Sequence, residues 1–281
     1  MDRQGIAIKW ILIMGIGTLV FLAGTATLMR RAGLGSGPVR VHADASPFSG
    51  DEAIRVYEKI GRNNDRGNLA GIFHALRENG SRPRLLGTME QPDIIWTVTE
   101  GQADAPGLLI TTSLSGENGL LAAAWLAELA RVVPRRGTRH RIMMVWRAAG
   151  EEAGGFRMAL EALRAAESWR GRIAGAIAVS IRRGSTPWIA RDARTPTTVW
   201  DTLLDASRRA GYVGLARPLP VETIRSDGWQ MDSMSVAGIE IGIPEASDRD
   251  AFRDGLKVTG DAFYHALVTL GYDMIVRLGM P

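Results

Sequence analysis

Apolar residues along the chain recur with two periods, which predict alternating helices and strands. Helical spacing predicts helices over residues 51–60, 68–76, 117–133, 153–169, 197–210 and 258–278. Short runs of apolar and β-branched residues predict buried strands over residues 93–98, 108–112, 141–146, 173–181 and 239–243. Asp51 is a candidate helix cap, and Pro134 is expected to end the long third helix. This alternation predicts an α/β fold with a mainly parallel mixed sheet sandwiched by helices.

An uncharged apolar run at residues 10–29 precedes the body of the chain. A helix of this length rises about 30 Å, the thickness of a membrane's hydrocarbon core. Trp10 at one end, and Arg30 with Arg31 at the other, suit the two membrane interfaces. Residues 1–31 are therefore predicted to form one N-terminal transmembrane anchor, with a cleaved signal peptide as the alternative. Residues 32–50, rich in Gly, Pro and Ser, are predicted to be a linker, and residues 51–281 one domain.

Composition narrows the chemistry of this body. The chain contains no Cys, which excludes disulfides, thiolate metal sites and a Cys nucleophile. Most of the net charge of +4 comes from basic residues in the first 31 positions. The body is therefore almost neutral, and no nucleic-acid partner is expected.

Chemistry in such a fold is expected at the carboxyl ends of the parallel strands. Glu151 and Glu152 follow the strand predicted over residues 141–146, in a Gly-Glu-Glu sequence. Taken alone, they are an ordinary helix start, because carboxylates suit a helix N-terminus. If they lie in a pocket without a metal, they need water or an arginine partner. The candidate partners are Arg147, Arg182 and Arg183.

The order of these segments resembles the zinc aminopeptidase and glutamate carboxypeptidase family (peptidase family M twenty-eight), whose relatives include glutaminyl cyclases. The clearest stretch is residues 139–163, RHRIMMVWRAAGEEAGGFRMALEAL, which is similar to the family's strand, Gly-Glu-Glu motif and following helix. The resemblance extends over roughly residues 107–278. It implies a zinc-aminopeptidase-like fold in which Glu151 is the general base and Glu152 a metal ligand.

The same resemblance implies that most metal ligands are missing. The family's His-x-Asp falls on Thr112-Ser113-Leu114, and its bridging aspartate falls on Asn118, beside Glu117. The histidine of its Ser-Asp-His segment falls on Gly228, after Asp227. A di-zinc site needs His and carboxylate ligands at several strand ends. The chain is therefore expected to be a degenerate member with no metal or other cofactor.

The leading prediction is a membrane-anchored, non-catalytic aminopeptidase-like scaffold or accessory subunit that binds a protein partner. Its inherited cleft would include Thr112, Glu117, Asn118, Glu152 and Asp227. One alternative is an active membrane-tethered metallo-aminopeptidase or amidohydrolase, with Glu151 as base and an atypical zinc site that includes Glu152. The other is a lipid- or glycan-binding module.

The side of the membrane is judged from two signals that disagree. Basic residues after the apolar run favour a cytoplasmic body by the positive-inside rule. Members of the resembled family are largely secreted, lumenal or surface proteins, which favours an extracytoplasmic one. The body is predicted to lie on the periplasmic side of a bacterial inner membrane. Trp188 falls in a predicted loop, where it is expected to serve an interface.

Overall fold

A computed structural model gives the fold of the body. It describes residues 39–40, 47–60, 65–90, 92–99, 107–136, 141–148, 173–191, 197–209, 211–216 and 236–269. Two predicted helices, the span at residues 10–29 and the helix at residues 153–169, lie outside these described residues. None of the described helices is long and apolar enough to cross a membrane.

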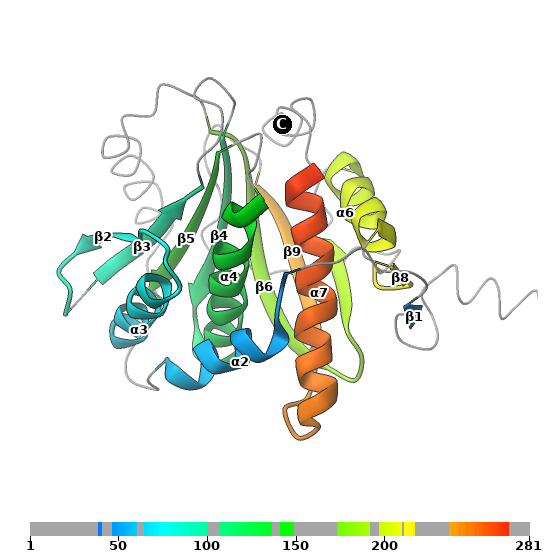
Figure 1. The fold of residues 1–281 in the computed structure, drawn as a ribbon, viewed down its shortest axis with the longest axis horizontal. Coiled ribbons are helices and arrows are strands. Elements are labelled where there is room, and N and C mark those ends of the chain that lie inside the picture. Colours follow the sequence, from blue (N-terminus) through cyan, green and yellow to red (C-terminus); the bar gives the residue numbers. More distant parts are fainter. Residues whose placement is uncertain are drawn as a thin grey trace, which may run out of the picture.

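Seven strands form one mixed sheet with the order β2-β3-β5-β4-β6-β9-β7 (Figure 1). Their bounds are β2 Arg84–Gly87, β3 Pro92–Val98, β4 Gly107–Leu114, β5 Ile142–Ala148, β6 Ile173–Gly184, β7 Trp188–Arg191 and β9 Val236–Pro244. The adjacent strands β5, β4, β6 and β9 run parallel, while β3 and β7 run antiparallel to them. The α/β prediction and its mixed sheet are confirmed.

Helices cover the face of the sheet that is turned toward the viewer in Figure 1. They are α2 Gly50–Lys59, α3 Asp65–Glu78, α4 Gly116–Arg136, α6 Thr197–Arg209 and α7 Arg249–Thr269. Helix α4 packs on β4 and β6 at the centre, α3 lies on β3 and α7 on β9, while α6 packs against α7. Two short strands, β1 Val39–Arg40 and β8 Tyr212–Val213, pair beside α6.

Several details differ from the sequence-based expectations. The N-cap of α2 is Ser49 and not Asp51, since the Ser49 hydroxyl accepts a hydrogen bond from the Glu52 amide at 3.3 Å. Helix α4 continues to Arg136, because Pro134 lies in its last turn and few hydrogen bonds remain to be lost there. Helix α7 begins at Arg249, nine residues earlier than predicted. The apolar pattern did not reveal these first turns, because most of their residues are polar. The expectation for Trp188 is wrong. It belongs to β7 and is buried against Gly242, where a Cβ would lie 2.1 Å from the indole.

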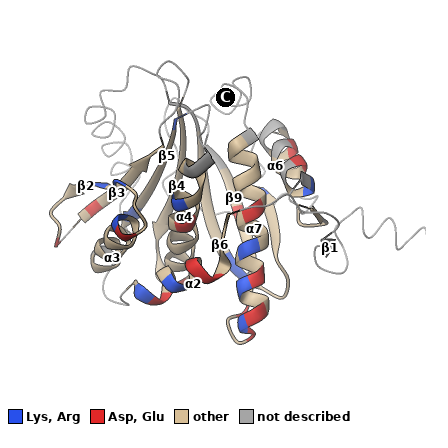
Figure 2. Cartoon of the chain, in the orientation of Figure 1, with Lys and Arg blue, Asp and Glu red and all other residues tan. Residues whose placement is uncertain are grey.

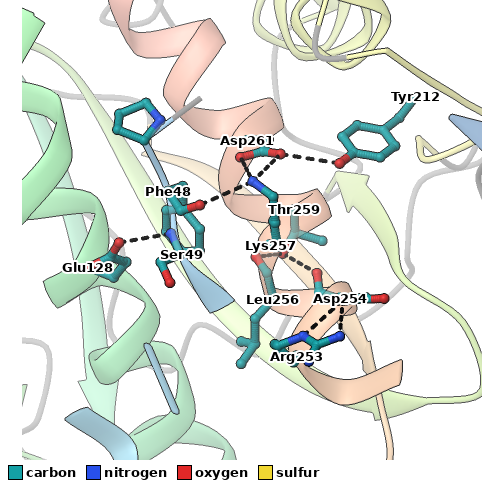
Figure 3. Close-up of polar contacts among 12 residues, drawn as sticks. Phe48, Ser49, Glu128, Tyr212, Arg253, Asp254, Leu256, Lys257, Thr259 and Asp261 are labelled. Atoms are coloured by element: carbon teal, nitrogen blue, oxygen red, sulfur yellow. Dashed lines mark hydrogen bonds and ion pairs between the residues drawn. The ribbon is translucent and has the colours of Figure 1, made fainter. Parts of the chain in front are cut away.

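Residues 47–49, here called the leading segment, pass between α4 and α7 (Figure 3). The Phe48 ring is buried against Gly260 of α7, where a Cβ would come within 2.3 Å of it. On the other side its centroid lies 6.0 Å from that of Trp125, which in turn meets Phe263 edge-to-face at 4.9 Å. Only glycine allows this approach, so the aromatic side chains tie the leading segment to both helices.

A buried carboxylate on α4 binds the same segment. Glu128 is fully buried, and its Oε1 accepts a hydrogen bond from the Ser49 amide at 2.9 Å. Arg131, one turn later, donates to both carboxylate oxygens, with Nε at 2.6 Å from Oε2. Burial raises the pKa of Glu128, although the hydrogen bonds from Arg131 and Ser49 oppose this. The buried charge of Glu128 is thus stabilised by three donor groups together, the Ser49 amide and two N–H groups of Arg131.

Helix α7 holds the leading segment from the opposite side. The Lys257 ammonium donates to the Phe48 carbonyl at 3.2 Å and to the Asp261 carboxylate at 3.1 Å. Asp261 also accepts from the Tyr212 hydroxyl of β8 at 3.2 Å (Figure 3). Side chains of α4 and α7 therefore bind the backbone of the leading segment from two sides, and Tyr212 of β8 is linked to it through Asp261 and Lys257.

We expect Glu128→Ala to destabilise the full chain by about 3–5 kcal/mol, because it leaves the largely buried Arg131 guanidinium without its carboxylate partner and the Ser49 amide without an acceptor. Replacing the pair together, Glu128→Met with Arg131→Met, should lose less, about 1–3 kcal/mol, since only the amide is then left without an acceptor. Guanidinium-induced unfolding followed by tryptophan fluorescence measures both. Glu58→Ala, at an exposed position of α2, is the control. A double variant as unstable as Glu128→Ala would contradict this account.

Candidate functional site at the carboxyl edge of the sheet

A tight turn joins β4 to α4 at the carboxyl edge of the parallel strands. Gly116 has φ of +63°, a left-handed conformation that favours glycine. Gly119 passes so close to β4 that a Cβ would lie 2.6 Å from the Ser113 carbonyl oxygen. The turn leaves Glu117 and Asn118 exposed in the first helical turn, where a carboxylate is favoured by the helix dipole.

Glu117 is the centre of a cluster of side chains drawn from four elements, α2, α4, β6 and α7. Its Oε1 accepts a hydrogen bond from the Tyr57 hydroxyl of α2 at 2.9 Å. The same oxygen lies 2.9 Å from Nη2 of Arg183, which comes from the carboxyl end of β6. The Arg183 guanidinium also lies over the Phe252 ring of α7, 4.9 Å from its centroid, in a cation–π contact. We call these four residues the edge cluster.

The edge cluster is partly shielded from solvent. The Arg183 side chain is only 15% exposed, whereas the Glu117 side chain is 66% exposed. An ion pair with one solvated partner adds little stability, but here the guanidinium is also fixed by an aromatic ring. Figure 2 shows that charged residues gather on α2 and α7 near this edge, while the central strands carry mostly other residues.

The remaining predicted site residues divide into two groups. Thr112 is buried within β4, paired in register with Trp146 of β5, and Leu114 is fully buried in the core. Asn118 is exposed next to Glu117. Glu151, Glu152 and Asp227 lie outside the described residues. The structure thus places Thr112, Glu117 and Asn118 along one strand and the turn that follows it.

Of the three arginines considered as partners for the Gly-Glu-Glu carboxylates, Arg183 contacts Glu117. Arg182, its neighbour on β6, is exposed, and Arg147 is almost fully buried at the carboxyl end of β5. The sequence identified both Glu117 and Arg183 but not their pairing. The Tyr57 contribution was missed because it comes from a helix 60 residues earlier in the chain.

The described residues do not fit a zinc centre. They contain no group of three or more His, Cys, Asp or Glu side chains that could hold a metal ion. At the strand end where the resembled family has His-x-Asp, a buried threonine and a leucine pack in the sheet. The neighbouring carboxylate, Glu117, already binds a guanidinium. No chemical step through a metal can be derived from this arrangement.

Comparison with known proteins supports the fold. No family model and no curated protein matches the sequence. Among solved structures, a glutaminyl cyclase from Bacteroides thetaiotaomicron, bound to N-acetylhistamine, is similar with a TM-score of 0.62 at 12% identity, over 81% of this chain and 100% of that one. An Acidobacteriales bacterium glutaminyl cyclase has a TM-score of 0.58 at 16% identity, over 86% of this chain and 100% of that one.

A leucine aminopeptidase precursor from Bacteroides thetaiotaomicron is similar as well, with a TM-score of 0.58 at 13% identity, covering 82% of this chain and 100% of that one. Identities this low establish the fold alone. The chain therefore has an aminopeptidase-like fold, as the resemblance implied, and its chemistry has to be judged from its own residues.

We expect Arg183→Met to destabilise the chain measurably, because it removes an ion pair and a cation–π contact together. In a double-mutant cycle with Glu117→Gln, the coupling energy should be about 0.5–1 kcal/mol. Arg182→Met, a change of the same kind at the adjacent exposed position, should have almost no effect. Chemical unfolding of the four proteins of the cycle and of Arg182→Met tests this, and equal losses for the two single methionine variants would contradict it.

Proposed function

We propose that this protein is a non-catalytic, aminopeptidase-like scaffold or accessory subunit that is anchored in a membrane and binds a protein partner. The edge cluster is the observation that carries the proposal. Ligands of open α/β sheets bind at the carboxyl ends of the strands. Here that edge presents the guanidinium of Arg183 bound to Glu117. Leu114, at the end of β4, is fully buried in the core and offers no metal ligand.

A metal ion at this edge would compete with a built-in cation. Arg183 and a zinc ion would have to share the carboxylate of Glu117, and their positive charges would repel each other at short range. The guanidinium is held by a hydrogen bond and an aromatic ring, so displacing it would also expose its buried side chain. These contacts favour a binding role over metal-assisted hydrolysis.

The membrane part of the proposal rests on residues 10–29, whose uncharged length matches a hydrocarbon core. We place the body on the periplasmic side of a bacterial inner membrane. The near-neutral charge of the body supports a protein partner rather than a nucleic acid.

The second candidate is an active zinc enzyme, because the similar structures are named as glutaminyl cyclases, an aminopeptidase precursor and a putative zinc-dependent exopeptidase. The Gly-Glu-Glu sequence with Glu151 and Glu152 also favours it. In that case Glu152 would bind zinc and Glu151 would be the base, as the family resemblance implies.

We expect the purified full chain to contain far less than one zinc per molecule by elemental analysis. It should neither hydrolyse an N-terminal leucine amide nor cyclise an N-terminal glutamine peptide, with or without added zinc. Glu151→Gln and Glu152→Ala should leave these results unchanged. Stoichiometric zinc that disappears in Glu152→Ala, together with turnover lost in Glu151→Gln, would support the enzyme instead.

We expect the full chain to resist alkaline carbonate extraction from membranes, and Ile13→Arg with Leu19→Arg to release it, because charges near the centre of a span oppose insertion. Since the chain has no Cys, a single Arg208→Cys on exposed α6 reports the side of the membrane. A membrane-impermeant maleimide should label it in spheroplasts, whereas buried Ile243→Cys should not react. Labelling only after lysis would place the body in the cytoplasm.

A further inference from the structure

The two edge strands of the sheet, β7 and β2, differ in whether another described segment pairs with their outer side. At the β7 edge, the Ile189 amide donates to the Leu215 carbonyl at 2.8 Å, and Ile189 forms a parallel bridge with Ala216. At the opposite edge, β2 pairs with β3 on its inner side, and no described strand lies along its outer side (Figure 1). An uncovered edge presents backbone donors and acceptors that can pair with another chain.

The side chains of β2 add a chemical preference to this edge. Leu86 is 40% exposed. Among the residues that the structure describes, it is the only large apolar residue that is exposed. Arg84 and Leu86 pair with Trp96 and Ile94 of β3, so they point to the same face of the sheet. Arg82, two residues before Arg84, is also exposed. This edge therefore combines two positive charges with one apolar contact.

The length of this edge limits what can bind. The β2–β3 ladder shifts register between Leu86 and Gly87, whose φ of +96° requires glycine. This bulge ends the regular edge after a few residues. Bulges and basic residues protect edges against unlimited pairing, so a short segment with matching charge fits better than a long hydrophobic strand.

We propose that β2 is a docking edge for a short, extended, acidic segment of a partner protein, which adds to the sheet as a further strand. Its carboxylates lie beside Arg82 and Arg84, and an apolar side chain covers Leu86. Backbone hydrogen bonds supply affinity, and the alternate side chains supply specificity. This inference deepens the proposed scaffold function, since it names the surface and the chemistry of the partner.

The test uses the acetylated peptide Val-Thr-Glu-Thr-Glu-Thr-Val as the probe and the full chain as the receptor. Its Glu and Val residues occupy alternate positions and therefore lie on one face of an extended strand, in either direction of pairing. Binding should be saturable by isothermal titration calorimetry. The same peptide with alternate backbone amides N-methylated should not bind, because methylation removes the strand's donors but keeps every charge. A peptide with Lys in place of Glu should not bind either. Loss of the difference between these peptides would overturn the proposal.

Variants then locate the site. Arg82→Glu with Arg84→Glu should weaken the acidic peptide at least about tenfold, the effect of about 1.4 kcal/mol. Arg55→Glu with Arg208→Glu makes the same charge change on exposed helices away from β2 and should have no effect. Leu86→Lys should weaken binding as well, which keeps the test decisive if the double charge reversal fails to fold.

Three further outcomes would overturn the docking edge. They are no binding of the acidic peptide, equal weakening by the two charge-reversed pairs, and a dimer of this chain that Leu86→Lys dissociates, which would make a second copy the occupant. Each can be told apart from failure of the proposed function, which is detected by zinc content and turnover and does not involve β2.

Discussion

The fully buried carboxylate of Glu128 is the constraint on which the arrangement of the helices depends. Moving such a charge out of water costs several kcal/mol, and only a complete set of donors offsets this. Arg131 supplies two hydrogen bonds from the same helix, and the third comes from the Ser49 backbone. The chain must therefore pass beside α4 before α2 begins. Since burial raises the pKa of Glu128, this group favours folding at low pH, and that contribution is lost as the pH rises through the raised value.

The edge cluster relates the fold to function in a different way. The edge cluster lies where the parallel strands end and a tight turn leads into α4, and α/β proteins place their binding sites at this edge of the sheet. The side chains there form an internal ion pair, with the Arg183 guanidinium bound to Glu117 and resting on Phe252. A fold can be retained while the chemistry of its site changes, because the core depends on apolar packing and the site on a few polar residues. The fully buried Leu114 at this edge belongs to that core.

The elements that sequence reasoning found are those with a strong apolar pattern. Strands β4 and β5 are buried almost throughout, and α4 has a long apolar period. Strand β2 was missed because most of it is exposed, and β7 because it is short and follows a Pro. For the site, the types and strand-end positions of Glu117 and Arg183 were predictable. Their pairing was not, since residues 66 apart share no local period. The Ser49–Glu128 hydrogen bond, across 79 residues, was hidden for the same reason.

The leading segment determines where an N-terminal truncation of this protein can begin. A chain cut at residue 51, the boundary that composition indicates, would lack Phe48 and leave a void beside Trp125 and Gly260. It would also remove the Ser49 amide from Glu128 and the Phe48 carbonyl from Lys257. A version freed of its N-terminal apolar run should therefore retain Pro47, although this residue belongs by composition to the linker.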